Sequence, residues 1–376
     1  MTEAFHPDYR NYFELIGIDS ETAKKRVQDT FDQMFFDPEE KIWHDTDPDA
    51  ACLVDTGNND ARTEGMSYGM MMCVQMDRQD LFDKLWQFSL RYMYMTEGKH
   101  AGYFAWSVQL DGKKNAWGPA PDGEEYFAAA LFMADARWGK GKWDYAAQAR
   151  ELLRHCVHQS EMVEGGFPMW DPDNHYIRFV PETLWSDPSY HLPHFYELFA
   201  LLADEADRPF FRQAAQASRD YIALCAHPQT GLSAEYAEYD GRMHEFIGKK
   251  FAFYSDAYRV AENIALHHIW CGPDRRLDDI AFRQQQFLKT HPACMEWACD
   301  LDGTLHTTEV MHPVGLLATV AAASAVTEDK EWLQRFWDTP LRKGTRRYYD
   351  NCLYLFCMMM LSGNYRLYLP SSIPQA

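Results

Sequence analysis

The 376-residue sequence has few basic residues for its size. Lys and Arg together number 36, against 56 Asp and Glu, which gives a formal net charge of −20 at pH 7. Nucleic acids and anionic membrane surfaces attract proteins through clustered Lys and Arg side chains. The charge therefore argues against both partners and fits a protein that acts on a neutral or cationic ligand.

Long apolar segments and paired cysteine motifs are also missing. No uninterrupted apolar run reaches the roughly 18 residues that a membrane helix needs, and the N-terminus lacks the basic start and apolar core of a secretory signal. The nine cysteines are scattered and form no C-x-x-C motif. We therefore expect buried, reduced thiols in a cytoplasmic protein, with a Cys294–Cys299 or Cys352–Cys357 disulfide as the alternative.

Several motifs of known catalytic sites are absent. The sequence contains no G-x-S-x-G, no Gly-rich phosphate loop and no dinucleotide fingerprint. His191 and His194 lack the Glu of an H-E-x-x-H zinc motif and flank Pro193, so His194 is expected to be a polar core residue. The Asp300-Leu-Asp-Gly segment lacks the rest of a calcium loop and predicts a hairpin turn instead. We expect neither metal nor cofactor.

Apolar and aromatic residues, by contrast, are abundant. Hydrophobic residues make up 47% of the chain and no low-complexity or Pro/Ser-rich linker divides it, so residues 1–376 are predicted to form a single domain. Aromatic residues make up 15%, and several Trp and Tyr lie beside Gly, Pro, Asn and Asp in loops. Aromatic faces pack against the C–H faces of sugars while neighbouring polar groups bind the hydroxyls. This composition indicates a carbohydrate-binding cleft.

Hydrophobic periodicity predicts an all-α fold in which buried and half-exposed helices alternate. A Pro- and Asp-rich loop follows the first helix, and Asp111-Gly112 predicts a hairpin. Buried helices are expected to start near residues 62, 119, 186, 255, 312 and 347, and amphipathic helices to span 8–34, 81–95, 144–157, 208–225, 278–288 and 328–337. This alternation predicts an (α/α)6 barrel of six inner and six outer helices, with short β-hairpin loops at one rim. An open α-solenoid, the alternative, should show a fixed repeat length.

The start of each predicted inner helix carries a polar residue. If the inner helices run parallel, these residues meet at one rim of the barrel. Asp is a common helix cap, so each residue taken alone has a structural explanation. Together, flanked by Tyr, Trp and Arg, they indicate an active site made of Glu64, Asp122, Asp187, Asp256, His312 and Asp350.

Two separated carboxyl groups on one rim are what glycoside hydrolysis needs, because one protonates the leaving oxygen and the other attacks or activates water. Asp256 at a helix N-terminus is expected to stay ionised and act as the base, with Arg259 one turn later orienting it. Glu64 needs a raised pKa to act as the acid, either through burial or through repulsion from Asp122. A simple capping role is the alternative for Glu64. Asp122 is also expected to bind ring hydroxyls and favour a distorted sugar.

Five segments resemble glycoside hydrolase family 8, and the resemblance covers nearly the whole chain. They include Arg62-Thr-Glu-Gly, Pro119-Ala-Pro-Asp-Gly, Ser186-Asp-Pro-Ser-Tyr, Ser255-Asp-Ala-Tyr-Arg and Arg346-Arg-Tyr-Tyr-Asp. The resemblance implies an (α/α)6 barrel and hydrolysis with inversion, with Glu64 as general acid, Asp256 as general base and Asp122 as a third carboxylate. It also implies a set of substrate-binding residues, namely Arg62, Trp106, Tyr190, Arg259 and Tyr349.

Within that family, the match is nearest to members that release xylose from the reducing end of short β-1,4-xylo-oligosaccharides. In those enzymes a His-Pro loop closes the cleft after one sugar, and Met311-His-Pro matches it. His312 would then block further subsites and bind the reducing-end hydroxyl. The alternative is that His312-Pro only begins a helix, because Pro is favoured in a first turn.

The expected function is therefore that of an inverting exo-glycosidase acting on xylo-oligosaccharides, as a monomer or, alternatively, a dimer. An endo-β-1,4-xylanase or endoglucanase of the same family would instead cleave long polymers. A sugar isomerase or epimerase would need paired histidines, whereas this rim is richer in carboxylates. A non-catalytic glycan binder would keep the aromatic residues and lose Glu64 or Asp256, and both are present.

Overall fold

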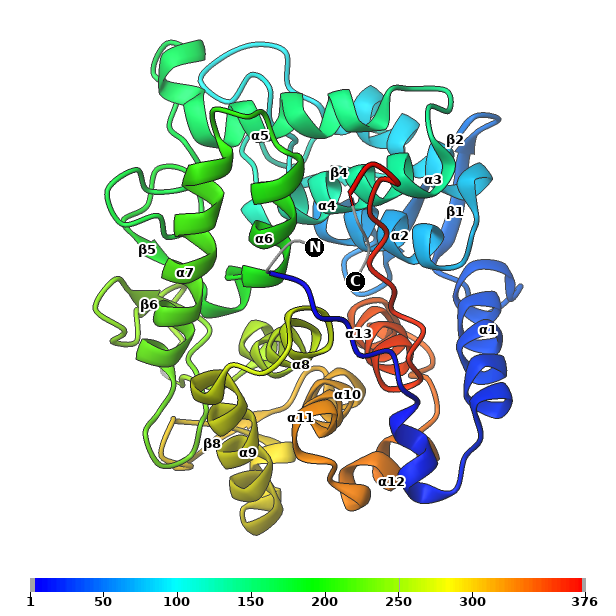
Figure 1. The fold of residues 1–376 in the computed structure, drawn as a ribbon, viewed down its shortest axis with the longest axis vertical. Coiled ribbons are helices and arrows are strands. Elements are labelled where there is room, and N and C mark those ends of the chain that lie inside the picture. The colour runs from blue at the N-terminus through cyan, green and yellow to red at the C-terminus, as the bar shows by residue number, and fades with distance from the viewer. Residues whose placement is uncertain (1–3, 250, 374–376) are drawn as a thin grey trace.

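The computed structural model describes residues 4–249 and 251–373. These residues are mostly helical, as predicted, with a few short strands (Figure 1). In this part of the chain, no helix combines the length and the apolar character needed to cross a bilayer. All nine cysteines are free and eight of them are buried, which confirms the predicted thiols.

Six helices of the described chain are buried on nearly all sides. In order, each of them contacts the next, and the last contacts the first, so the contacts form a closed ring. A helix that is apolar all round needs such a surrounding, because no face can be left to water. The six are α2 (Thr63–Gln75), α4 (Pro121–Trp138), α6 (Pro193–Leu202), α8 (Arg259–Cys271), α10 (Pro313–Ala322) and α13 (Arg347–Leu361).

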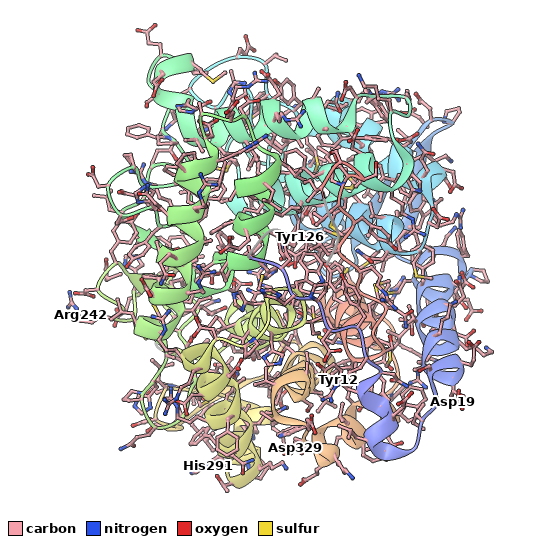
Figure 2. All side chains as sticks on the ribbon, viewed as in Figure 1. Tyr12, Asp19, Tyr126, Arg242, His291 and Asp329 are labelled. Atoms are coloured by element: carbon pink, nitrogen blue, oxygen red, sulfur yellow. The ribbon has the colours of Figure 1, made fainter. Side chains whose placement is uncertain are left out.

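The middle of this ring is filled with aromatic rings. Tyr126 of α4, labelled near the centre of Figure 2, lies with its ring centroid 4.7 Å from that of Tyr68 and 4.8 Å from that of Phe195. These two partners come from α2 and α6, so one side chain joins three helices. Edge-to-face pairs of this kind add stability beyond the area they bury.

Each buried helix packs against one helix with an exposed face. The six pairs are α2 with α3 (Gln79–Phe88), α4 with α5 (Tyr145–Met162), α6 with α7 (Arg208–Cys225), α8 with α9 (Arg275–Thr290), α10 with α12 (Lys330–Asp338) and α13 with α1 (Ser20–Phe36). Between α10 and α12 the chain forms only the short α11 (Ser324–Thr327). The predicted alternation of buried and half-exposed helices is confirmed.

The N-terminal prediction of one helix over 8–34 was wrong. The chain instead forms the 3-10 helix η1 (Tyr12–Ile16) and then α1. Gly17 ends η1 with a φ of +83°, a conformation that favours glycine, and Asp19 accepts the Thr22 N–H to cap α1. The Gly17 signal that ends η1 and the Asp19 signal that starts α1 both lie inside one stretch of apolar periodicity. Because this periodicity continues across them, it predicted a single helix.

The prediction of a loop after the first helix was also wrong, because most of this segment forms strands. An antiparallel sheet in the order β1-β2-β3-β4 consists of β1 (Trp43–Asp47), β2 (Ala50–Asp55), β3 (Asp60–Arg62) and β4 (Ser107–Gln109). β3 leads directly into α2, so the sheet holds the start of the helix that carries Glu64. The predicted turn at Asp111-Gly112 follows β4, with Gly112 at a φ of +87°.

Two smaller antiparallel strand pairs accompany this sheet. β5 (Trp185–Ser186) pairs with β6 (Ala237–Glu238), and β7 (Trp297–Cys299) pairs with β8 (Leu305–Glu309). The turn between β7 and β8 contains Gly303, which confirms the hairpin predicted from Asp300-Leu-Asp-Gly.

Two inner helices begin later than predicted. The helices expected near residues 186 and 255 are each preceded by a 3-10 turn, η3 (Pro188–Tyr190) and η4 (Ser255–Tyr258). In the first case Pro193 explains the delay, because a residue before proline is kept out of the α conformation and α6 begins at the proline itself. Asp187 and Asp256 therefore lie on turns that precede α6 and α8.

Candidate active site

The Arg259 guanidinium is the centre of a cluster of four carboxyl groups. Arg259 is the first residue of α8 and its side chain is 4% exposed. Its Nη1 lies 3.3 Å from Glu64 Oε2 and 3.1 Å from Asp122 Oδ2. Its Nη2 lies 3.5 Å from Asp256 Oδ1 and 3.7 Å from Asp187 Oδ2. Four of the predicted rim residues thus meet at one cation.

This convergence follows from where the carboxyl groups sit in the chain. Glu64 and Asp122 lie in the first turns of α2 and α4, and Asp187 and Asp256 lie on the turns before α6 and α8. The four neighbouring helices therefore present their N-terminal ends to the same space. Every residue of α2 is buried except Glu64, so the helix leaves only this side chain partly open.

The surroundings of Glu64 favour the protonated form of its carboxyl group. Its Oε1 accepts a hydrogen bond from the Tyr348 hydroxyl at 2.9 Å, and its Oε2 faces Arg259. Burial raises the pKa of Glu64 to about 7, with Arg259 opposing the shift and Asp122 adding to it. The sequence left burial and repulsion from Asp122 open as causes, and burial is the larger. Near neutral pH, Glu64 therefore carries a proton much of the time.

Asp256 is the more open of the two carboxyl groups proposed for proton transfer. Its side chain is 27% exposed, against 17% for Glu64. The Tyr236 hydroxyl lies 3.5 Å from Oδ2, and the Asp256 N–H donates to Glu235 Oε1 at 3.4 Å. The sequence pattern suggested that Asp256 is a helix N-cap, and this prediction was wrong. Asp256 lies inside the first turn of η4, and its carboxylate contacts the Arg259 guanidinium instead of cap N–H groups.

Glu64 and Asp256 line one cavity of about 210 Å³. The other lining side chains come from β2, β3 and the turn between them, from η4 and the segment before it, and from the starts of α10 and α13. Three of them are predicted substrate-binding residues, namely Arg62, His312 and Tyr349. The structure therefore brings the proposed acid, the proposed base and these three side chains to one space.

The remaining predicted residues lie beside this cavity. Asp122 is 5% exposed and Tyr190 is 6% exposed, and both contact Arg259, the latter with its ring centroid 5.4 Å from the guanidinium carbon. Trp106 is 38% exposed, and the Arg62 guanidinium carbon lies 5.3 Å from its ring centroid. Trp106 therefore offers an open aromatic face next to Arg62.

Arg62 is held rigidly by two acidic side chains. Its Nε lies 3.1 Å from Asp55 Oδ2 and 3.1 Å from Asp60 Oδ1. Both carboxylates are almost fully buried and come from β2 and β3. The sheet thus orients Arg62 over Trp106, at the edge of the cavity.

Asp350 is the one predicted rim carboxylate that stands apart from the Arg259 cluster. Its side chain is 0% exposed, and its Oδ2 lies 2.9 Å from His312 Nδ1. The His312 ring contacts the Tyr349 ring edge to face at 4.7 Å. Asp350 therefore lies behind His312 and does not line the cavity.

Several residues that line the cavity were not predicted from the sequence, among them Tyr348, Glu235 and Lys249. Tyr348 is adjacent to the predicted Tyr349 in the first turn of α13, and the Tyr-Tyr pair was a usable signal that either ring reaches the cavity. Glu235 and Lys249 both line the cavity and form an ion pair at 2.7 Å. Burial, followed by repulsion from Asp256, raises the pKa of Glu235 to about 7. These two lie in irregular segments without a motif, so no pattern pointed to them.

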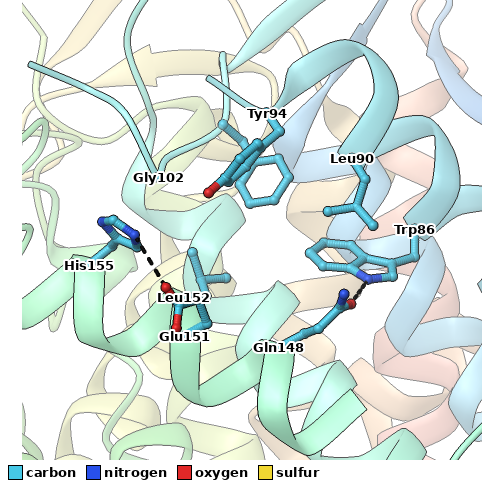
Figure 3. A pocket seen from close by; sticks show the side chains of 9 residues that line it. Trp86, Leu90, Tyr94, Gly102, Gln148, Glu151, Leu152 and His155 are labelled. Carbon is cyan, nitrogen blue, oxygen red and sulfur yellow. Dashed lines mark hydrogen bonds and ion pairs between the residues drawn. The ribbon is translucent and has the colours of Figure 1, made fainter. Parts of the chain in front are cut away.

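A second cavity, of about 250 Å³, lies between α3 and α5 (Figure 3). Its wall is mostly apolar and includes Trp86, Leu90 and Tyr94. Its one carboxylate, Glu151, lies 3.7 Å from His155 Nε2. None of the carboxyl groups around Arg259 lines it, so this cavity lacks the acid–base pair of the first.

A protonated carboxyl group and a second, more exposed carboxylate facing one cavity form the arrangement by which glycoside hydrolases cleave glycosidic bonds. The comparisons with known proteins agree with this class. The model of the family described as glycosyl hydrolases family 8 matches residues 50–363. The chain belongs to glycosyl hydrolases family 8.

Relatives of known activity align with nearly the full length of the chain. The reducing end xylose-releasing exo-oligoxylanase of Halalkalibacterium halodurans is 52% identical over 372 residues, which cover 96% of this chain and 95% of the relative. The enzyme of the same name from Bifidobacterium adolescentis is 50% identical over 366 residues, covering 94% and 96%. A crystal structure of a reducing-end-xylose releasing exo-oligoxylanase mutant complexed with xylobiose superposes with a TM-score of 0.93 at 51% identity, covering 96% of this chain and 98% of that one.

Proposed function

We propose that this chain is an inverting exo-glycosidase that releases xylose from the reducing end of short β-1,4-xylo-oligosaccharides. The observation that carries the proposal is that Glu64 and Asp256 contact different nitrogens of the Arg259 guanidinium and line the same cavity. Two relatives named for this activity are 52% and 50% identical to this chain over nearly its whole length. They support the choice of substrate. The closed ring of buried helices with its outer partners supports an (α/α)6 barrel as the scaffold.

In the proposed mechanism Glu64 is the general acid. With a pKa of about 7 it holds a proton in neutral solution and gives it to the departing glycosidic oxygen. Asp256 is the general base and takes a proton from the water that attacks the anomeric carbon on the opposite face of the sugar. The two carboxyl groups contact different nitrogens of the Arg259 guanidinium, and inversion requires space for that water between the sugar and Asp256.

The neighbouring side chains are proposed to hold the sugar. Trp106 offers its open ring to a sugar face, and Arg62 beside it donates to hydroxyl groups. Asp122 and Tyr190 lie against Arg259, where they bind hydroxyls of the sugar that reacts. Tyr349 completes the wall on the side of His312.

Release of a single sugar needs a barrier past the cleaved bond. His312 and Met311 line the cavity together with the proposed acid and base. The imidazole is backed by Asp350 and by the edge of the Tyr349 ring, so it cannot turn away from the cavity without losing both contacts. We assign His312 the role of this barrier.

Digestion of a xylo-oligosaccharide labelled at its reducing end tests the function directly. Purified protein should convert labelled xylotetraose to labelled free xylose and unlabelled xylotriose. NMR should detect the new reducing end of the xylotriose first as the α anomer, because water attacks the anomeric carbon of that sugar and inversion of a β-linkage gives an α product. Labelled oligomers of mixed length would identify an endo-acting enzyme instead. The β anomer appearing first would contradict inversion, and an intact substrate would contradict the proposed activity as a whole.

A further inference from the structure

The Asp350 carboxylate, in the first turn of α13, is saturated with hydrogen bonds. Its Oδ1 accepts the N–H groups of Val314 at 2.9 Å and Gly315 at 2.8 Å. Its Oδ2 accepts from His312 Nδ1 at 2.9 Å and from Arg342 Nη1 at 2.6 Å. A carboxylate offers about four lone-pair positions, and these four donors occupy them. Asp350 therefore has no acceptor left for a substrate and acts on its neighbours.

One effect is on the start of α10. His312 occupies the N-cap position of this helix, but its side chain makes no cap hydrogen bond. Asp350 supplies the cap from another helix, because the Val314 and Gly315 N–H groups belong to the unpaired donors of the first turn. The backbone on which His312 stands is thus fixed to α13.

Arg342 provides a second attachment for the same segment. Besides Asp350, its Nη1 donates to the Met311 carbonyl at 2.7 Å. The Arg342 backbone is itself anchored, since its N–H donates to Asn351 Oδ1 at 2.9 Å and its carbonyl accepts from Asn351 Nδ2 at 3.0 Å. The guanidinium therefore links Met311, the residue before His312, to Asp350 of α13.

The same contacts select one tautomer of His312. An ionised carboxylate only accepts hydrogen bonds, so the imidazole Nδ1 that faces Asp350 carries the hydrogen. In the neutral ring the other nitrogen, Nε2, then holds a lone pair. Within the described residues Nε2 makes no hydrogen bond, and His312 lines the cavity. A lone pair at this place accepts a hydrogen bond from a sugar hydroxyl.

We propose that the Arg342–Asp350 pair decides how many sugar units fit beyond the cleaved bond. It does so by holding Met311 and His312 across the cavity, with His312 Nε2 presented as the acceptor. This inference rests on the proposed exo-activity and adds two positioning residues to it. Without the guanidinium, the Met311 carbonyl loses its donor and Asp350 loses its cationic partner. The segment can then move outward and admit a longer leaving group.

The test is the product pattern of Arg342→Met with xylotetraose labelled at the reducing end. The wild type should place the label in free xylose. In the variant, the fraction of label in xylobiose should rise at least about tenfold, the change expected when one charge-assisted hydrogen bond is lost. Arg342→Lys keeps the charge and should restore most of the wild-type pattern. Arg276→Met is the matched control, because it removes an exposed pair with Asp220, neither residue lines the cavity, and the pattern should stay unchanged.

The proposal is overturned if Arg342→Met still releases only labelled xylose, whether its reaction is fast or slow. Arg342 would then contribute only to folding. If circular dichroism shows that this variant does not fold, Arg342→Gln replaces it and the same two product patterns decide. The wild type is measured first. If it leaves the substrate intact or already releases labelled xylobiose, the exo-activity itself is contradicted, and this proposal is overturned with it.

Discussion

The Tyr348 hydroxyl donates a hydrogen bond to Glu64 Oε1 at 2.9 Å, although the two residues lie 284 positions apart in the chain. Burial is the main cause that raises the pKa of Glu64 to about 7, and this bond, which favours the ionised form, opposes it. The hydroxyl therefore contributes to how strongly the proposed acid holds its proton.

Replacing Tyr348 by Phe should move the alkaline limb of activity to higher pH. Glu64 acts in its protonated form, so kcat/KM falls as pH rises through its pKa, near 7 in the wild type. Loss of the Tyr348 hydrogen bond raises that pKa further and shifts the limb upward, while kcat/KM at pH 6 falls by less than about tenfold. The pH profile of kcat/KM checks this. Tyr349→Phe is the control, because its hydroxyl donates to the Ser255 carbonyl and should leave the limb in place.

Removing either proposed proton-transfer group should nearly abolish hydrolysis. Glu64→Gln and Asp256→Asn keep the shape of the side chains and remove the acid or the base, so kcat should fall about 10²- to 10⁴-fold. The loss in Glu64→Gln should be much smaller on a substrate whose leaving group needs no proton. Rates on xylotriose and on an aryl xyloside, measured side by side, check both statements. A variant with near wild-type activity on xylotriose would remove that residue from the mechanism.

Arg259→Met should destabilise the protein strongly. Four carboxyl groups lose their shared cation in a nearly closed site, and breaking a buried ion pair costs roughly 3–5 kcal/mol. Urea unfolding at pH 7 measures the change. Arg219→Met is the matched control, because Arg219 pairs with a single carboxylate, that of Glu197, at 2.9 Å. An equal loss in both variants would show that the cluster adds nothing beyond one pair.

Ionisation of the buried Glu262 carboxyl group should make the protein less stable as pH rises. Burial raises the pKa of this α8 carboxyl group to about 8 from an ordinary 4.5, so the folded state binds a proton that the unfolded state releases between those values. Because the unfolded state binds fewer protons there, the free energy of unfolding falls from about pH 4.5 to pH 8. Glu262→Gln stays neutral and keeps an acceptor for Cys357. At pH 8.5 it should be more stable than the wild type by on the order of 5 kcal/mol, because 3.5 pKa units at about 1.4 kcal/mol each are almost fully lost there.

Unfolding curves of both proteins at pH 5 and pH 8.5 give this comparison. The difference between them should be small at pH 5, where the wild-type carboxyl group is also neutral. A constant difference at both pH values would contradict the buried titration. Lys25→Gln, which removes one exposed ion pair with Asp29, provides a background for the effect of a surface charge change.

Local patterns in the sequence were enough to place most helices and their polar starts. Hydrophobic periodicity depends on neighbours three and four positions apart, so it predicted the span 208–225, which is that of α7, without knowledge of the fold. The helix-start motifs likewise located Glu64 and Asp122. The family follows from these motifs, and the comparisons confirm it. The cytoplasmic location and the monomeric state stay predictions.

Only the tertiary structure decided how these starts meet. Arg259 joins four carboxyl groups, and its partner Glu64 lies 195 positions away in the chain, so no local pattern reports their contact. The same holds for Tyr348 at Glu64 and for Lys249 at Glu235. Asp350 shows the difference most clearly. The sequence placed it among the possible catalytic carboxylates. In the folded chain it accepts hydrogen bonds from His312 and Arg342 and holds these side chains in place. Which chemistry a carboxyl group performs depends on its burial and on its donors, and these are properties of the folded chain.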